Sequence, residues 1–265
     1  MERKIENLRD QPHWSYSALQ CYLTCPMKYK FRYVDNAPVE RTCSALPFGR
    51  AFHAVLSERA WKGSEFTLED AKENFAFFFQ GETEVSENLV YKPGESFDSC
   101  LEKGLDMLKV AYENWSDDYV VKTVAESFKV DVPGLSKPLI GEFDLVVTDG
   151  GDEAVCDWKT ASSKWPMGKA NRDLQATAFC YAYKKIHGKS PLFRFDVYTK
   201  TKIPTLNQYY TLRTQDELDR FEFVAGKIEQ AVNTELFFPN ENLINCAECP
   251  YADRCKKSTR KGSEL

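Results

Sequence analysis

Two short runs of alternating apolar and acidic residues carry the side chains best suited to chemistry. The runs cover residues 141–147 and 154–159. They are separated by a loop that contains Gly150 and Gly151, and a Gly-Gly pair between two alternating runs is a strong signal for a β-hairpin. With the turn centred between these glycines, Asp144 and Asp157 lie opposite each other on neighbouring strands.

Opposed residues share one face of a sheet, with Cβ atoms about 5 Å apart. Two carboxylates placed in this way repel each other unless a cation lies between Asp144 and Asp157. Side chains alternate along a strand, so Lys159 points to the same face as Asp157. Carboxylate oxygens suit Mg²⁺ or Mn²⁺, and such a cation beside a lysine can hydrolyse a phosphodiester. Glu126, in the preceding alternating run, is a candidate to flank the metal. The alternative is a set of solvent-facing hairpin charges.

A second group of reactive side chains lies near the C-terminus. Cys246, Cys249 and Cys255 have the spacing Cys-x₂-Cys-x₅-Cys, which allows three thiolates to bind one centre. No histidine is near them, so a closed four-ligand site needs a distant partner. Sulfur-rich sites hold zinc or iron–sulfur clusters, and the spacing alone does not separate the two.

Basic and aromatic residues alternate in the N-terminal part of the chain. Lys28, Lys30 and Arg32 stand among tyrosines and a phenylalanine. This mixture suits single-stranded nucleic acid, through phosphate contacts and base stacking. The alternative is that the aromatic rings are core residues and the basic side chains are solvated.

The elements that position these groups follow from hydrophobic periodicity and capping signals. Helices are expected from Ser15 or Ser17 to about 34, over 48–61, after Thr67 with Asp70 completing a capping box, and over 97–115, 171–187 and 214–232. Strands are expected over 119–132, 139–147, 154–159, 193–199 and 208–212, and the tail after Phe238 is expected to be irregular. This order predicts an α/β fold with a mixed central sheet and a helical part before the first catalytic strand.

The composition of the 265-residue chain is that of a globular protein, with 43% hydrophobic and 14% aromatic residues. The net charge of −5 argues against a chain that coats nucleic acid, but it leaves room for a local binding groove. No apolar run is long enough to cross a membrane, and the N-terminus lacks the apolar stretch of a secretory signal. We expect a soluble cytoplasmic protein.

The hairpin and its surroundings resemble the PD-(D/E)xK nucleases of the RecB-like group. The motifs that carry the resemblance are Gly-x-x-Asp at 141–144, Asp-x-Lys at 157–159, the segment 14–33 with its Cys-Pro pair, Gly-x-x-x-His at 49–53, and Asp-Leu-Gln at 173–175. The resemblance implies a restriction-endonuclease-like core, with His53, Asp144 and Asp157 as metal ligands and Lys159 as the catalytic lysine. It also implies Glu126 as an accessory acid and Gln175 as a contact to the nucleic acid or the metal-bound water.

One position departs from the group. A tyrosine is common four residues after the glutamine, where this chain has Phe179. Tyr181 lies nearby but two residues late, and we keep it as a candidate nucleic-acid contact.

The cysteines resemble those of relatives that hold a [4Fe-4S] cluster, among them CRISPR-associated RecB-like exonucleases and AddB-type recombination nucleases. The resemblance implies a structural cluster on Cys25 together with the three tail cysteines, with Cys21 as the reserve choice for the fourth ligand. Structural Zn²⁺ is the alternative occupant.

Together these features predict one nuclease domain over residues 1–265, with a helical insertion at about 54–118 and a cluster-binding segment at about 239–265. The expected activity is Mg²⁺- or Mn²⁺-dependent cleavage of DNA ends or single strands, in recombination, repair, phage DNA processing or CRISPR adaptation, with a bacterial, archaeal or viral origin. A helicase or an adaptation or recombination protein is a conceivable partner. The alternatives are a catalytically silent nuclease-like module that binds DNA or protein, and a zinc-stabilised structural protein.

Overall fold

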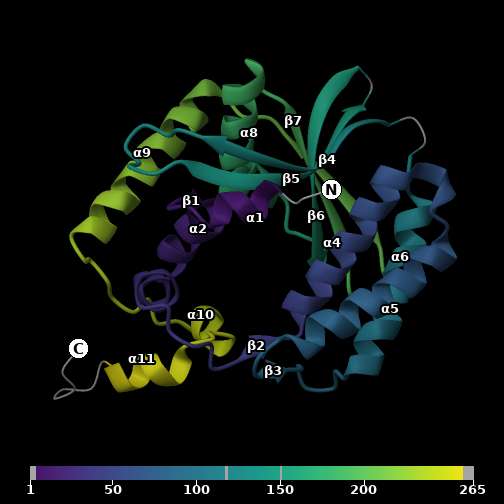
Figure 1. The fold of residues 1–265 in the computed structure, drawn as a ribbon, viewed down its shortest axis with the longest axis horizontal. Coiled ribbons are helices and arrows are strands. Elements are labelled where there is room, and N and C mark those ends of the chain that lie inside the picture. Colours follow the sequence, from purple (N-terminus) through teal and green to yellow (C-terminus); the bar gives the residue numbers. More distant parts are fainter. Residues whose placement is uncertain (1–3, 117–118, 150, 259–265) are drawn as a thin grey trace.

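The computed structural model describes residues 4–116, 119–149 and 151–258. Its centre is a mixed sheet with the strand order β1-β5-β6-β7-β8, and β4 pairs with β5 beside this path (Figure 1). The strands are β1 (Trp14–Ser15), β4 (Val120–Val130), β5 (Leu139–Asp149), β6 (Asp152–Ala161), β7 (Leu192–Thr199) and β8 (Leu206–Thr211). β6 is antiparallel to β5 and parallel to β7, so the predicted mixed sheet is confirmed.

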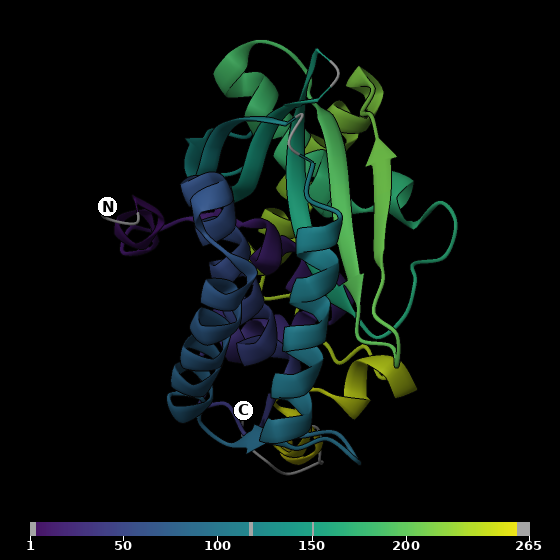
Figure 2. The same cartoon turned by 90° about the vertical axis from the view of Figure 1, so that its right-hand side faces the viewer.

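Helices cover both faces of the sheet. They are α1 (Lys4–Arg9), α2 (Tyr16–Thr24), α3 (Pro26–Tyr29), α4 (Ala45–Lys62), α5 (Leu68–Glu84), α6 (Phe97–Glu113), α7 (Lys169–Arg172), α8 (Leu174–His187), α9 (Gln215–Asn233), α10 (Leu243–Ala247) and α11 (Ala252–Ser258). α4, α5 and α6 lie together on one face (Figure 2), and α2, α8 and α9 pack on the other. The short strands β2 (Thr42–Cys43) and β3 (Leu89–Val90) form a separate parallel pair.

Each face of the sheet has its own hydrophobic core. Under α4 and α5 the core is rich in phenylalanine, and the rings of Phe48, Phe52, Phe75 and Phe79 have centroids 5.4–6.4 Å apart. Such contacts fix the angle between helices, because large rings interdigitate only in a few arrangements. α4 is thereby held against the sheet, and it is the helix that carries His53.

Several element boundaries differ from the prediction. The expected long first helix is interrupted at Cys25, which is extended (φ −161°, ψ 108°) because the residue before a proline avoids the helical region. A π-helical turn (Lys30–Val34) follows α3. The tail after Phe238 contains α10 and α11 and is not wholly irregular. The capping box of Thr67 and Asp70 is confirmed.

The turn of the β5–β6 hairpin is as short as the prediction requires. Asp149 pairs with Asp152, so two residues connect the strands. Gly151 has φ 97°, a value that favours glycine, and Gly150 lies outside the described residues.

None of the helices in the described ranges combines the length and the apolar character needed to span a membrane.

Candidate active site

The β5–β6 hairpin has the register that the sequence predicts. The backbone pairing runs from the turn to Leu145 and Cys156, and the next two positions are Asp144 and Asp157. Here a side chain replaces the backbone carbonyl as the hydrogen-bond acceptor between the strands. Asp144 Oδ2 accepts a hydrogen bond from the backbone N–H of Trp158 at 2.9 Å. The two carboxylates therefore stand where the paired part of the hairpin ends.

Four elements bring predicted site residues together around these carboxylates. His53 on α4 places Nδ1 3.4 Å from Asp144 Oδ2. Lys159 on β6 forms an ion pair with Asp157 Oδ2. Gln175 on α8 donates from Nε2 to Asp157 Oδ1 at 2.5 Å. The Asp157 side chain is only 3% exposed, whereas His53 and Lys159 keep 32% and 29% of their side chains accessible, so the group can be reached from solvent through the cationic residues.

The net pKa shifts of the two carboxyl groups have opposite directions. Burial acts to raise the pKa of Asp144, but His53 and Lys159 outweigh it and the pKa is lowered. Burial raises the pKa of Asp157, and the nearby Asp144 adds to this effect against the opposing charge of Lys159. Asp144 likewise raises the pKa of His53, although burial alone would lower it. Acidic pairs that share a small buried space behave in this way, with one member held ionised.

The donor set fits a hard divalent cation by its chemistry, with two carboxylates and one imidazole. Asp157 Oδ2 is buried and its negative charge is balanced by the Lys159 ammonium, so it is an oxygen in a position suited to a cation. Within residues 4–116, 119–149 and 151–258, however, no three His, Cys, Asp or Glu side chains are already arranged to hold a metal ion. Binding therefore requires side-chain adjustments, foremost by Lys159.

The structure does not bring Glu126 to this group. Glu126 on β4 pairs directly with Phe143, which belongs to the core under α8, and the two residues share a face of the sheet. Its Oε2 accepts a hydrogen bond from Thr123 Oγ1 at 2.6 Å. The adjacent Ala125 has φ 50°, which disturbs the alternation on which the expectation for Glu126 rests.

Two residues that sequence reasoning did not assign lie at the site. Burial raises the pKa of Tyr16, and the charges of Asp173 and Asp157 raise it further. Asp173 caps α8 by accepting a hydrogen bond from the Gln175 N–H at 2.8 Å. The signal for Tyr16 was its place directly after a helix-capping serine, and the signal for Asp173 was its place just before Gln175.

A buried arginine fixes the corner between α7 and α8. Arg213 is 5% exposed and donates to Thr177 Oγ1 and to the carbonyl of Ala170, both at 2.8 Å. It also donates to the carbonyl of Asp173 at 3.1 Å. Because Asp173 begins α8, these bonds orient the first turn of α8, which carries Gln175.

The four cysteines named from the resemblance line a single cavity of about 610 Å³. They are Cys25, Cys246, Cys249 and Cys255. Cys21 instead lies in the core under α2, 8% exposed, and burial raises its pKa to about 11. Lys28, Arg41 and Lys256 line the same cavity, and burial, with the neighbouring cysteines, raises the pKa of Cys255 to about 11.

The N-terminal helices and the C-terminal tail lie side by side (Figure 1). The Met27 N–H donates to the carbonyl of Phe238 at 3.0 Å, and Asn240 donates from Nδ2 to the carbonyl of Thr24 at 2.9 Å. The carboxylate of Glu40 accepts hydrogen bonds from the N–H groups of Asp253 and Arg254 at the start of α11. The chain ends are thus joined around the cysteine cavity.

The predicted nucleic-acid contacts on the N-terminal helices are in varied surroundings. Lys28 faces the cysteine cavity, Lys30 pairs with Asp35 at 3.0 Å, and the guanidinium of Arg32 lies 5.3 Å from the ring centroid of Tyr33. Of the three, Arg32 is exposed, and Lys28 and Lys30 are partly buried.

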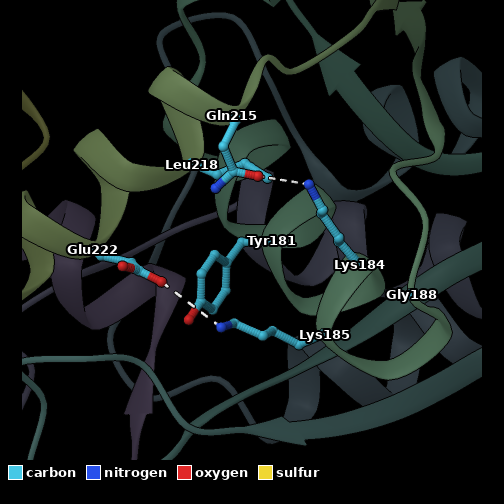
Figure 3. A pocket seen from close by; sticks show the side chains of 7 residues that line it. All are labelled: Tyr181, Lys184, Lys185, Gly188, Gln215, Leu218 and Glu222. Atoms are coloured by element: carbon cyan, nitrogen blue, oxygen red, sulfur yellow. Dashed lines mark hydrogen bonds and ion pairs between the residues drawn. The ribbon is translucent and has the colours of Figure 1, made fainter.

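Tyr181 is buried and lines a different pocket. It is 3% exposed, and its hydroxyl donates to the carbonyl of Asp131 at 3.2 Å. The pocket has a volume of about 260 Å³ and lies between α8 and α9, with Lys185 and Glu222 paired at 3.9 Å (Figure 3). This position does not favour a contact between Tyr181 and a substrate at the hairpin.

Comparison with known proteins identifies the family and supports the fold. The sequence model of the PD-(D/E)XK nuclease superfamily matches residues 13–256. The crystal structure of a candidate exonuclease from Eubacterium rectale aligns with 96% of this chain and 90% of that one, with a TM-score of 0.60 and 12% identity. The structure of the protein SSO0001 aligns with 92% of this chain and 96% of that one, with a TM-score of 0.41 and 11% identity. No curated protein matches the sequence. The fold is a restriction-endonuclease-like α/β core, and the chain belongs to the PD-(D/E)XK nuclease superfamily.

Proposed function

We propose that the chain is a metal-dependent nuclease that hydrolyses DNA phosphodiesters beside Asp144 and Asp157. The observation that carries the proposal is the convergence of these two carboxylates with His53, Lys159 and Gln175 from four elements. Nucleases of the PD-(D/E)XK superfamily generally use Mg²⁺ or Mn²⁺, and the oxygen-rich donor set suits both ions.

In this proposal Asp144, Asp157 and His53 hold the cation. A divalent cation, when bound, supplies Lewis acidity toward the phosphate and a lower pKa for water. Lys159 contributes a fixed positive charge. Burial acts to lower its pKa, but Asp157 and Asp144 outweigh burial and raise it. An ammonium that stays charged is suited to stabilising negative charge on the phosphate in the transition state.

The proposed mode of cleavage is exonucleolytic, at DNA ends or on single strands. The exonuclease description of the similar Eubacterium rectale protein supports this mode. Recombination, repair, phage DNA processing and CRISPR adaptation are settings that use such an activity, with a helicase or an adaptation or recombination protein as a partner. The alternative function is a silent module that binds DNA or protein without cleavage.

Cleavage of single-stranded DNA labelled at either end, with Mn²⁺ or Mg²⁺ or with neither, tests the proposal. Asp157→Asn and Lys159→Met should each lose about 10²–10³-fold in rate, because each removes a charge at the reacting phosphate. Lys129→Met, on the exposed side of β4, is the matched control and should cleave like the wild type. Equal residual cleavage by all four proteins would indicate contamination and favour the binding module. The label that is released first reports the polarity.

We further propose a structural [4Fe-4S] cluster on Cys25, Cys246, Cys249 and Cys255, with zinc as the competing occupant. Four thiols around one cavity support a soft-metal centre, and the cationic side chains that line the cavity offset the charge of the thiolates. Iron, sulfide and zinc analysis of anaerobically purified protein decides between the two. Cys25→Ser should lose the metal and Cys43→Ser, outside the cavity, should retain it. Wild-type protein with neither metal would contradict the proposal.

A further inference from the structure

The loop between β6 and α7 is anchored to the sheet by Trp165. Residues 162–168 form it, and Figure 2 shows it as the loop that runs outward at the right of the sheet. Trp165 anchors the middle of the loop. Its backbone N–H donates to Tyr209 Oη at 3.1 Å, and its backbone carbonyl accepts from the same hydroxyl at 3.2 Å. The indole also stacks on the Tyr209 ring, with centroids 5.7 Å apart, and lies 4.9 Å from the Phe195 ring.

This anchored loop ends in a tight turn that presents an apolar side chain to solvent. The Lys169 N–H donates to the carbonyl of Pro166 at 3.2 Å and closes the turn. A glycine with positive φ at the third position favours such a turn, and Gly168 has φ 77°. Met167, between Pro166 and Gly168, is 100% exposed. The hydrogen bonds of Trp165 therefore hold a turn in which the Met167 side chain is fully exposed.

Both ends of the loop are attached to the candidate active site. Lys159 lies two residues before the end of β6, and its Nζ is 6.0 Å from the centroid of the Phe195 ring on which Trp165 packs. On the other side, α7 leads directly to Asp173 and to Gln175, which bonds to Asp157. The loop thus connects two parts of the chain that carry residues of the proposed reaction site.

Positive charge surrounds the apolar tip. Lys164, Lys169 and Arg172 are exposed, and Lys169 Nζ lies 3.9 Å from the centroid of the Trp165 ring. A single exposed methionine on a surface is ordinary. The end of duplex DNA presents a flat apolar base pair between two rows of phosphates. An exposed methionine flanked by cations is complementary to such an end.

We propose that the turn 164–168 is a wedge that meets the end of duplex DNA. Met167 packs on the terminal base pair and unstacks it, while Lys164 and Arg172 contact the phosphates of the strands that separate. A strand released in this way enters the site beside Lys159. This inference rests on the proposed nuclease function, because it assigns the duplex-end specificity of the same site.

The test measures base unstacking without cleavage. A blunt duplex carries 2-aminopurine at its last base pair and is bound by protein with Lys159→Ala, so that the substrate stays intact. Binding should raise the fluorescence about fivefold as the base leaves the stack, and adding Met167→Ser should abolish most of the rise. Phe77→Ser on α5, which removes another exposed apolar side chain (76% exposed), is the control and should keep the rise.

Cleavage rates give the second measurement. With Lys159 restored, Met167→Ser should slow the degradation of blunt duplex about tenfold, as expected when unstacking is no longer assisted, and should leave that of single strands within about twofold. Equal loss on both substrates, or fluorescence that does not depend on Met167, would overturn the wedge while leaving the nuclease proposal intact. A Met167-dependent rise in fluorescence with no cleavage by the wild type would keep the wedge and reject the nuclease.

Discussion

The two aspartates at the end of the hairpin, Asp144 and Asp157, differ in the groups that they contact. Asp144 is bonded to a backbone N–H and faces His53, whereas Asp157 lies between the Lys159 ammonium and the Gln175 amide. Asp157 is the more deeply buried of the two, and its orientation depends on side chains from two other elements. The function of Asp157 in the proposed site should therefore depend on the residues that orient its carboxylate, even where these do not contact the substrate.

Gln175 is the residue for which this sensitivity can be measured. Gln175→Ala removes the 2.5 Å hydrogen bond to Asp157 and should lower kcat about 10–100-fold, because a misplaced ligand loses the productive geometry. Gln175→Glu should be worse than Gln175→Ala at neutral pH, since it adds a third carboxylate. Single-turnover cleavage of a saturating substrate checks the order. Full activity of both variants would show that Asp157 needs no support from α8.

Glu153 predicts how stability depends on pH. Hydrogen bonds from Lys122, Tyr183 and Lys189 lower the pKa of Glu153 from 4.5 to about 2. A depressed carboxyl pKa stabilises the fold above the unfolded value of 4.5, and the contribution disappears as the pH falls toward about 2. Because solvent screens this group, the contribution is about 1 kcal/mol. Urea unfolding at pH 7 and pH 3 should show a larger pH-dependent loss for the wild type than for Glu153→Gln, and identical losses would contradict the assignment.

At the scale of elements, the position of α4 depends on how α5 and α6 pack beside it. Gly104 on α6 faces the ring of Phe75 on α5, and a Cβ at Gly104 would lie 2.0 Å from Phe75 Cε1. That ring also contacts Phe48 and Phe52 on α4, the helix that carries His53. A close contact between two helices is thus linked to the placement of a proposed metal ligand.

Two glycine substitutions separate close packing from helix propensity. Gly104→Ala should destabilise the protein by about 1–3 kcal/mol, because the ring of Phe75 must move within a filled core. Gly81→Ala, on α5 with no atom within 4 Å of the added Cβ, should stabilise it by about 0.5–1 kcal/mol. Urea denaturation of both variants provides the comparison. A similar change in the free energy of unfolding, with the same sign in both variants, would mean that the Phe75 ring moves aside at little cost.

At the scale of the whole molecule, the two ends of the chain meet around the cysteine cavity. The N-terminal helices that carry Cys25 are joined by hydrogen bonds to the tail, whose cysteines complete the cavity lining. A metal centre that joins Cys25 to Cys255 closes a loop of most of the chain, and such closure restricts the unfolded state strongly.

Loss of the proposed metal centre should therefore affect the stability of the entire domain. Cys25→Ser should lower Tm by on the order of 10 °C relative to metal-loaded wild type, since metal binding contributes to folding free energy. Cys43→Ser is the matched control and should change Tm little. Thermal unfolding followed by circular dichroism makes the comparison, with metal content measured on the same samples. An unchanged Tm in protein that has lost its metal would show that the metal centre does not stabilise the whole domain.

The sequence by itself determined the hairpin and its register, which place Asp144 and Asp157 at neighbouring positions on the two strands. This was possible because a two-residue glycine turn and strict alternation are local signals, and together they specify which residues face each other. The capping box at Thr67 and the mixed sheet were likewise readable from short-range patterns and element order.

Only the tertiary structure decided which other side chains reach the site. Glu126 and Tyr181 belonged to the correct elements, but a positive φ at Ala125 and the packing of α8 against α9 turned them elsewhere. Tyr16 reached the site because α2 packs beside β5 and α8, a contact between segments far apart in the sequence. Which face of a helix meets a sheet depends on the whole core, and no local pattern contains that information.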